Sequence, residues 1–388
     1  MVLAMHDYAI THGKGQDKRW YTFVPDESKS DKRRKIRKQT REELIDYLYD
    51  YYFVAGNSED AKNLLLPFVF DRWIAYRLST TNRETTVRRN ETDFRKYYLN
   101  EPLSKDLLTT PLNLLTKNDL EEWAYRMIKK YHLTQKAYSN MTLIIRQIYT
   151  YLVDENILEQ NTFERVHIRT SAFRKTRKKS AQSQIFFPDE IEAIFRSVSE
   201  RLLETNDEAY LAIPMMYYTG IRIGECLALK FEDFDQERGT LCISRSLIRR
   251  DRRNEDGSWN TSRYVIEDYL KQNADPRTIL VTDECFEILQ QIRAIRKVKG
   301  YISPYLFEVK TPNNIEMKLY RICDELEIPR RSPHKLRKTY VSELMNSRLD
   351  PDFIRTQVGH KDLLTTWNAY TYTTTRDEEM LRKIADAL

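Results

Sequence analysis

Glycine, proline and cysteine are scarce in this sequence. Its 388 residues include 9 glycines, 12 prolines and 4 cysteines. So few glycines and prolines argue against a loop-rich β architecture and favour helices. The cysteines (Cys226, Cys242, Cys285 and Cys323) are widely spaced and form neither a CxxC pair nor a cysteine–histidine ligand pattern. We therefore expect reduced, mostly buried thiols and no metal site.

Long apolar runs are also missing. No stretch approaches the length of a membrane span, and the first residues, MVLAMHDYAITHGKGQ, lack the apolar core of a secretory signal. These absences predict a soluble, intracellular protein that does not associate with a membrane.

Apolar and charged side chains are both plentiful. Hydrophobic residues make up 41% of the chain and charged residues 31%, and 64 lysines and arginines stand against 58 acidic residues. This composition can bury cores and is not that of a disordered chain. A chain of this length is expected to form two or three domains, and its small basic surplus is informative only where it clusters.

Local patterns divide the chain into four segments. Residues 1–60 contain three short strands, around YAIT, RWYTFV and KRRKIRKQT, and an amphipathic helix, REELIDYLYDYYF, which Thr40 can cap. Residues 64–168 carry four helical segments, and residues 169–184 form a polar, basic linker without periodicity. From 185 to 388 we expect an α-rich domain with a small antiparallel sheet. The predicted fold class is mainly α and multidomain.

The strands of the last segment are predicted from their β-branched residues. TLCISRSLI (240–248) and RTILVT (277–282) are expected to be strands on either side of a polar, irregular stretch. YLKQNADPRTILV (269–281) is predicted to form a tight hairpin that presents Lys271.

One arginine is placed by a helix break. In TGIRIGECLALKFEDFD (219–235), Thr219 and Gly220 end a buried helix and Arg222 opens the next one. Such an arginine is held by scaffold on both sides, which suits a fixed guanidinium. By itself, an arginine at a helix end is more often a surface residue.

A second motif combines a histidine with an arginine. In SPHKLRKTYVSEL, Ser332 is predicted to cap a helix whose first residue is Pro333. His334 and Arg337 then project from one face near the positive end of the helix, where donors gather around an anion. An HxxR pair alone is a weak signal.

A third motif, VGH, places His360 directly after a glycine at a helix end, and two tyrosines follow. The combined set holds two arginines, two histidines, a lysine and a tyrosine, without an obligatory carboxylate base. Such a set stabilises a negatively charged, pentacoordinate phosphorus. A tyrosine hydroxyl, whose ordinary pKa is about 10, needs cationic surroundings to attack phosphate at neutral pH.

The joint pattern resembles the tyrosine recombinase family, also called the phage integrase family. TGIRIGE, HKLR, VGH and a tyrosine about ten residues later match the family in order and spacing from residue 187 to the end. Residues 64–160 resemble its helical, SAM-like core-type DNA-binding domain. RWYTFVPDESKSDKRRKIRKQTREELIDYLYDYY is similar to the arm-type DNA-binding domain of integrases from conjugative transposons and Gram-positive prophages.

The resemblance implies roles for the motif residues. Arg222 and Arg337 match the two arginines that clamp the non-bridging oxygens of the scissile phosphate. His334 and His360 match the histidines that hydrogen-bond this phosphate and assist proton transfer at the nucleophile. Glu225 matches a family glutamate, which we interpret as support for the arginine helix.

The lysine and the nucleophile are assigned by spacing. Lys271 matches the hairpin lysine that protonates the departing 5′-oxygen, although this chain has KQNADPR where the family usually has a KT pair and serines. Tyr370, ten residues after His360, is the expected nucleophile. Tyr372 is the alternative, and it stands where relatives often have the histidine of a YTH ending.

The implied mechanism needs no metal, nucleotide or other cofactor. The tyrosine attacks one strand and forms a 3′-phosphotyrosine, which a 5′-hydroxyl of the partner duplex then attacks, so that a mobile element is integrated or excised through a four-way junction. The implied partners are double-stranded DNA, with core-type and arm-type sites, and three further copies of the chain in a tetramer. An excisionase and a host DNA-bending protein are candidate partners. The expected location is the nucleoid in the bacterial cytoplasm.

The end of the chain carries an apolar stripe, Met380, Ile384 and Leu388, at helical spacing. This stripe can dock on a neighbouring protomer or pack against its own domain.

Candidate DNA contacts are basic residues of the N-terminal strand, of two helical segments and of the linker, and we expect mostly phosphate contacts. They are Lys32, Arg33, Arg34, Lys35, Arg37, Lys38, Arg83, Arg88, Arg89, Lys136, Arg146, Arg174, Lys175, Arg177, Lys178 and Lys179.

Two other functions share parts of this pattern. A type IB topoisomerase or a telomere resolvase would use the same tyrosine site, but relaxing DNA needs no separate arm-site reader. A catalytically silent DNA-binding protein derived from a recombinase is the third alternative, and the intact set of six site residues argues against it.

Overall fold

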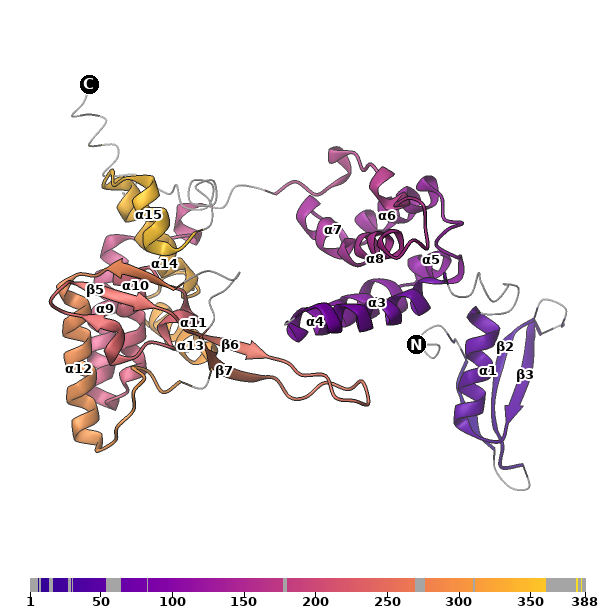
Figure 1. The fold of residues 1–388 in the computed structure, drawn as a ribbon, viewed down its shortest axis with the longest axis horizontal. Coiled ribbons are helices and arrows are strands. Elements are labelled where there is room, and N and C mark those ends of the chain that lie inside the picture. Colours follow the sequence, from indigo (N-terminus) through magenta and orange to yellow (C-terminus); the bar gives the residue numbers. More distant parts are fainter. Residues whose placement is uncertain are drawn as a thin grey trace. The chain divides into compact units, whose positions relative to one another are not determined.

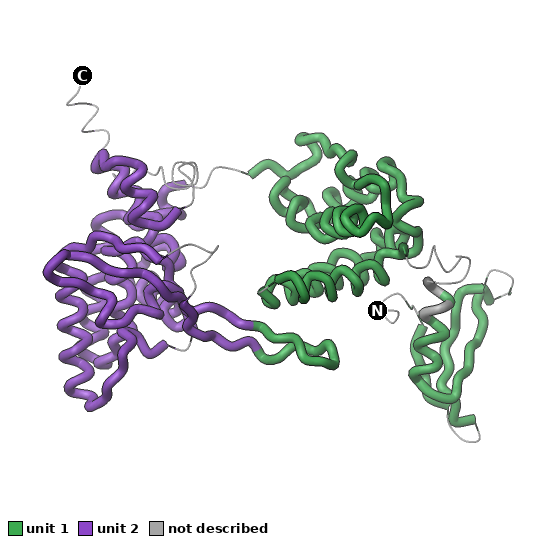
Figure 2. Tube along the Cα trace, viewed as in Figure 1, with its two compact units in different colours: residues 1–177, 251–261 green, residues 178–250, 262–388 purple. Residues whose placement is uncertain are grey.

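The chain forms two compact units (Figure 2). One unit comprises residues 1–177 and 251–261, and the other comprises residues 178–250 and 262–388. The structure, a computed structural model, describes residues 6, 8–13, 17–26, 29, 31–53, 64–81, 83–176, 180–268, 276–309, 311–360, 382 and 385.

The first unit begins with a three-stranded antiparallel sheet and one helix (Figure 1). Because side chains alternate along β2, Thr22 and Val24 are buried on one face, where Leu48 of the helix also lies. The backbone N–H of Glu43 donates to Oγ1 of Thr40 at 3.1 Å, so the predicted cap is confirmed. The elements are β1 (Thr11–His12), β2 (Trp20–Pro25), β3 (Arg33–Lys38) and α1 (Arg41–Phe53).

The middle of the chain is helical and packs around large aromatic side chains. Trp73, Phe94, Tyr98 and Tyr149 are fully or almost fully buried, and Tyr98 donates its hydroxyl to the carbonyl oxygen of Met141 at 2.9 Å. The helices are α3 (Leu66–Thr80), α4 (Glu84–Phe94) with a π-helical continuation (Arg95–Leu99), α5 (Lys105–Thr109), α6 (Lys117–Tyr131), α7 (Gln135–Met141) and α8 (Leu143–Asp154).

The second unit is α-rich and carries two small antiparallel sheets (Figure 1). One sheet has the order β4-β5-β8 and the other pairs β6 with β7. The strands are β4 (Phe234–Asp235), β5 (Thr240–Ile243), β6 (Ser246–Arg250), β7 (Arg263–Glu267) and β8 (Arg277–Leu280). The helices are α9 (Pro188–Thr205), α10 (Ala212–Thr219), α11 (Ile223–Cys226), α12 (Asp283–Lys299), α13 (Pro312–Glu325), α14 (His334–Asn346) and α15 (Pro351–Val358). The predicted mainly α fold, with an N-terminal three-stranded sheet, is confirmed.

Two local predictions in this unit are wrong. The segment 240–248 is not one strand, because it breaks after Ile243 and continues in the other sheet as β6. β8 pairs with β5, and β7 pairs with β6. The first arm of the expected hairpin at 269–281, with Lys271, lies outside the described residues. Ser332 does not cap α14 with its side chain: the helix begins one residue later than expected, at His334, with Pro333 at the N-cap position.

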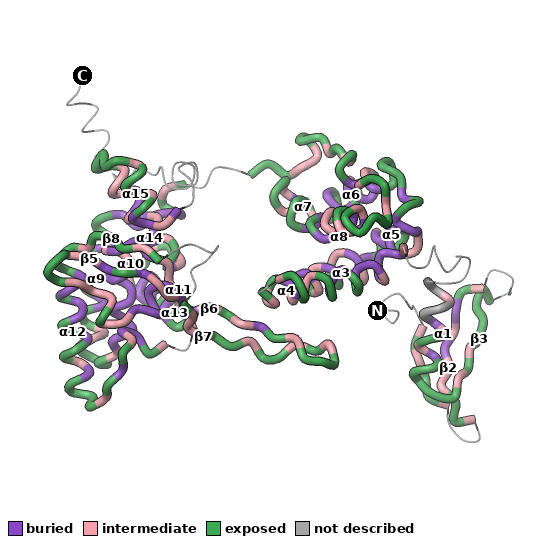
Figure 3. The backbone as a smooth tube through the Cα atoms, in the orientation of Figure 1, coloured by how far each residue is buried: buried purple, intermediate pink, exposed green. Residues whose placement is uncertain are grey.

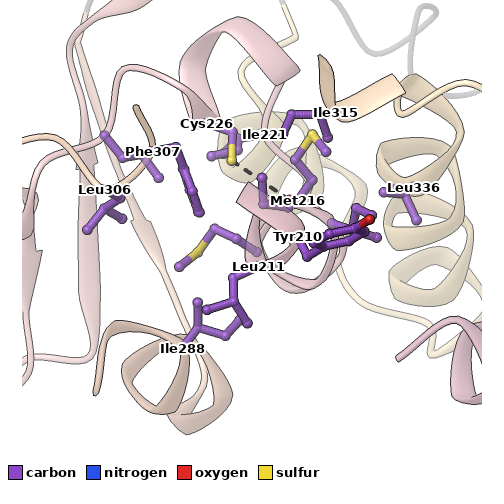
Figure 4. Packing of buried hydrophobic residues seen from close by; sticks show 14 of the residues in the cluster. Tyr210, Leu211, Met216, Ile221, Cys226, Ile288, Leu306, Phe307, Ile315 and Leu336 are labelled. Carbon is purple, nitrogen blue, oxygen red and sulfur yellow. Dashed lines mark hydrogen bonds between the residues drawn. The ribbon is translucent and has the colours of Figure 1, made fainter. Parts of the chain in front are cut away.

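The core of the second unit anchors the segments that carry the motifs (Figure 4). Ile221 and Cys226, on either side of Arg222, are almost fully buried, and so is Leu336, next to Arg337. Because these neighbours are fixed in a close-packed core, the polar side chains between them have little positional freedom.

Candidate active site

Two tight turns deliver the motif residues. Gly220 is the C-cap of α10 and Gly359 is the C-cap of α15, and both glycines adopt the left-handed conformation, with φ of 62° and 68°. A Cβ atom at Gly220 would lie 2.2 Å from Cδ1 of Tyr340, so only glycine lets α14 pack this closely. The turns place Arg222 and His360 directly after the two helix ends.

Arg337 joins both turns to α14. Its side chain is 1% exposed, and its Nη1 and Nη2 donate to the carbonyl oxygens of Gly220, at 2.8 Å, and Val358, at 2.7 Å. Two bonds from one planar guanidinium fix its plane as well as its position. The three motifs, far apart in the sequence, therefore meet at one buried arginine.

Arg222 is held by Glu225 one helical turn away. Its Nη1 donates to Oε1 of Glu225 at 2.7 Å, its backbone N–H donates to Oε2 at 3.1 Å, and its Nη2 lies 3.4 Å from the carbonyl oxygen of Gly359. Glu225 is 1% exposed. The interpretation of Glu225 as support for the arginine helix agrees with this geometry.

A third arginine, which the sequence did not single out, completes the group. Arg277, the first residue of β8, donates from Nη2 to Oε2 of Glu225 at 2.7 Å. Burial alone would raise the pKa of Glu225, but Arg277, Arg222 and Arg337 together lower it, so this carboxylate stays ionised. The signal in the sequence was an arginine opening an otherwise apolar strand, where a buried cation needs a buried acid.

Both histidines lie in a cationic environment. Burial, followed by the charges of Arg337 and Arg222, lowers the pKa of His360 to about 3. Burial and the charge of Arg337 also lower the pKa of His334, to about 4. His334 is the more exposed of the two, so we expect solvent to weaken its shift. At neutral pH each ring is therefore neutral, with one N–H donor and one acceptor nitrogen.

Several predicted site residues lie outside the described residues. They are Lys271, Tyr370, the alternative Tyr372, the linker residues Arg177, Lys178 and Lys179, and the stripe formed by Met380, Ile384 and Leu388.

The basic residues of the N-terminal sheet lie on both of its faces, and most of them are exposed. Nζ of Lys35 lies 3.7 Å from the ring centre of Tyr21, and the guanidinium of Arg33 lies 4.7 Å from that of Phe23. Lys32, Arg34 and Arg37 are likewise exposed. These side chains are accessible to a DNA backbone.

The basic residues of the helical part fall into two groups. Arg83, Arg89 and Lys136, and Arg174 and Lys175 of the linker, are exposed. Two others are engaged within the protein. Nη1 of Arg88 donates to Oδ1 of the buried Asp251 at 2.6 Å, and Nη2 of Arg146 donates to the carbonyl oxygen of Ser139 at 2.6 Å.

The contact of Arg88 belongs to a cluster that residues 251–261 form on α4. The backbone N–H of Arg253 donates to Oε2 of Glu84 at 2.6 Å, and Nε1 of Trp259 donates to Oε2 of Glu91 at 2.7 Å. Arg88 thus has a structural partner in addition to its predicted role in DNA binding.

Two features are absent from the described part of the chain. No three His, Cys, Asp or Glu side chains among them gather in a way that could hold a metal ion. No helix among them is long and apolar enough to cross a membrane.

Comparison with known proteins gives a consistent picture. The model of the phage integrase family matches residues 184–376. Tyrosine recombinase XerC of Listeria welshimeri is 25% identical over 308 residues, which cover 76% of this chain and 88% of XerC. The transposase from transposon Tn916 of Enterococcus faecalis is 25% identical over 312 residues, which cover 74% of this chain and 71% of the transposase.

Solved structures share the fold. The integrase of transposon Tn1549, in complex with a circular intermediate DNA, superimposes with a TM-score of 0.61 at 20% identity, over 82% of this chain and 99% of that chain. Lambda integrase, as a dimer bound to a core site, gives a TM-score of 0.51 at 13% identity, over 92% and 93% of the two chains.

Proposed function

Because the chain belongs to the tyrosine recombinase (phage integrase) family, whose members cleave and rejoin DNA, we propose that it is the integrase of a mobile genetic element. It would integrate and excise this element by strand exchange between two sites, through a four-way junction, in the cytoplasm of a bacterium. The supporting similarities are those to the Tn916 transposase and to the fold of the Tn1549 integrase.

The observation that carries the proposal is the clustering of Arg222, Arg337, His334 and His360. Two guanidinium groups have fixed planes, and their charges act on both imidazoles, so side chains from three chain segments share one site. Donors that are fixed before the substrate binds cost no reorganisation when charge develops on the phosphate oxygens. A phosphodiester fits this set because it offers two non-bridging oxygens to two arginines.

The chemical step is a transesterification without net change in the number of phosphodiester bonds. The hydroxyl oxygen of Tyr370 bonds to phosphorus while the bond from phosphorus to the 5′-oxygen breaks. A neutral imidazole accepts the tyrosine proton, and Lys271 protonates the departing oxygen. A 5′-hydroxyl of the second duplex then attacks the phosphotyrosine in the reverse sense.

We further propose that four protomers act on two duplexes, since each protomer contributes one nucleophile. The N-terminal sheet would bind arm-type sites, and the helical domain with residues 185–388 would bind the core site. The apolar stripe at the end of the chain would dock on a neighbouring protomer.

A suicide substrate tests this function. A duplex of the attachment site with a nick near the cleavage position loses a short strand after attack, so the phosphotyrosine adduct accumulates and migrates slowly on a denaturing gel. We expect an adduct with the wild type and with Tyr372→Phe, and none with Tyr370→Phe. The reverse result for the two tyrosines would move the nucleophile to Tyr372. Binding without an adduct in the wild type would refute the catalytic proposal.

Relaxation of supercoiled plasmid separates recombination from topoisomerase activity. We expect recombination of two attachment sites on one plasmid and no relaxation of a plasmid without such a site. Relaxation that needs no site would favour the topoisomerase alternative.

A further inference from the structure

The third arginine, Arg277, has no role in the chemical step described above. Its side chain is 10% exposed, and both of its terminal nitrogens point to one carboxylate: Nη2 lies 2.7 Å from Oε2 of Glu225, and Nη1 lies 3.5 Å from Oε1. Its guanidinium is therefore directed at Glu225.

Glu225 connects this arginine to the phosphate site. The same two carboxylate oxygens accept from the side chain and the backbone of Arg222. Arg222 alone holds this carboxylate from one side. With Arg277 on the other side, the carboxylate plane is fixed.

The position of Arg277 is itself fixed by the end of α15. A Cβ atom at Gly359 would lie 2.8 Å from Nε and 2.9 Å from Cζ of Arg277, so the turn before His360 rests on this guanidinium. The helix end is also tied to β8: the amide of Gln357 donates to the carbonyl oxygen of Leu280 at 2.5 Å and accepts from its backbone N–H at 3.3 Å. Arg277 of β8 thus contacts both Glu225, which supports Arg222, and the turn at Gly359, which precedes His360.

We propose that Arg277 is a positioning residue of the DNA cleavage reaction, which orients Arg222 through Glu225 and supports the turn that carries His360. The inference rests on the function proposed above. It predicts a specific energetic coupling. Because Arg277 acts through Glu225, removing Arg277 should slow adduct formation only while residue 225 is a carboxylate.

The test measures single-turnover adduct formation on the suicide substrate, together with the dissociation constant for the same duplex and the melting temperature. We expect Arg277→Met to slow adduct formation by about 10²-fold, as a small misplacement of a catalytic group does, while the dissociation constant stays within about threefold of the wild type. Arg277→Lys keeps the charge but not the planar guanidinium, so its rate of adduct formation should lie between those of the wild type and Arg277→Met. This variant replaces Arg277→Met in the test if Arg277→Met does not fold.

A matched control separates positioning from stability. Arg245 forms a similar buried ion pair with Asp233 in the same unit, at 2.5 Å and with 15% of its side chain exposed. Arg245→Met should lower the melting temperature about as much as Arg277→Met without slowing adduct formation comparably. In a Glu225→Gln background, Arg277→Met should slow the reaction by less than about threefold further.

Each contrary result has a distinct meaning. Three results would overturn the positioning role alone. They are a wild-type rate in Arg277→Met, rates that follow the melting temperature in both Arg277→Met and Arg245→Met, and full additivity of Arg277→Met with Glu225→Gln. If the wild type forms no adduct, the proposed function and this inference fall together.

Discussion

The cations of the active site and those of strand β3 are held in opposite ways. Arg337 and Arg222 are oriented by backbone carbonyls and by one buried carboxylate. On β3, which is largely exposed (Figure 3), Arg33 and Lys35 lie over aromatic rings, and Arg37 faces Asp17 at 3.6 Å. The first group is buried and held by several bonds, whereas the second is largely exposed.

The difference follows from what each group must do. A guanidinium that stabilises a transition state must be in place before charge develops, and a buried cation is tolerated only with a full set of partners. A cation that neutralises DNA phosphate works by charge, and its exposed contacts contribute little to stability. Variants that exchange or remove cations in the two regions therefore test whether the regions differ in this way.

The largest effect is expected from Arg337→Lys. One ammonium cannot reach the carbonyl oxygens of both Gly220 and Val358, so the cleavage rate should fall by about 10²–10³-fold, and the protein should lose about 1–3 kcal/mol of stability. The measurements are single-turnover adduct formation and urea unfolding. The same exchange on β3, Arg37→Lys, should leave both unchanged. Equal effects of the two exchanges would contradict the comparison.

The second effect concerns the turn before His360. Gly359→Ala combines a left-handed backbone, which disfavours any Cβ atom by about 1–2 kcal/mol, with a clash against Arg277. Gly300→Ala is the matched control, because Gly300 has a φ of 70° and a Cβ atom added there would meet nothing within 4 Å. Both variants should lose similar backbone free energy, but only Gly359→Ala should slow adduct formation, by about tenfold or more. Similar rates in both would mean that the contact with Arg277 is unimportant.

The sequence predicted the active-site turns because they are local. TGIR, HKLR and VGH each carry their own helix end or helix start, so the placement of Arg222, Arg337 and His360 follows from short-range geometry. It did not predict β7, although the polar NEDGSW before RYVIE is a turn signal followed by alternating residues. Two sheets share the segment 240–248, and only tertiary packing decides where it breaks.

The partners in long-range ion pairs could not be predicted from the sequence. The bond between Arg88 and Asp251 joins residues 163 positions apart, and the bond between Arg277 and Glu225 joins residues 52 positions apart. The apolar strand that Arg277 opens marks it as a buried cation but does not identify its partner, and nothing near Arg88 distinguishes an arginine that will face DNA from one that will face a buried carboxylate. The ion pair of Arg88 with Asp251 is therefore known only from the structure.

A third prediction uses the buried histidine. Because His360 has a pKa of about 3 in the folded protein and an ordinary value of about 6.5 when unfolded, the unfolded chain binds more protons between these values. The stability contributed by the neutral ring is therefore fully present above about pH 6.5 and is lost as the pH falls towards 3. Urea unfolding at about pH 7 and about pH 5 should show a loss about 1–2 kcal/mol larger in the wild type than in His360→Gln. Equal losses would show that the ring is not buried in its neutral form.

The smallest effect is expected on β3, where single cations contribute additively. Lys35→Ala should weaken binding of arm-site DNA only a few-fold at about 0.1 M salt and reduce the slope of log K against log salt concentration by about 0.9, the contribution of one phosphate contact. Lys297→Ala removes one charge from the exposed face of α12 and should leave both quantities unchanged. Adduct formation on the core site should be the same in the two variants. An equal slope in the wild type and Lys35→Ala would show that β3 does not face the phosphate backbone, and a large loss of affinity from this single lysine would show that it is held as rigidly as Arg337.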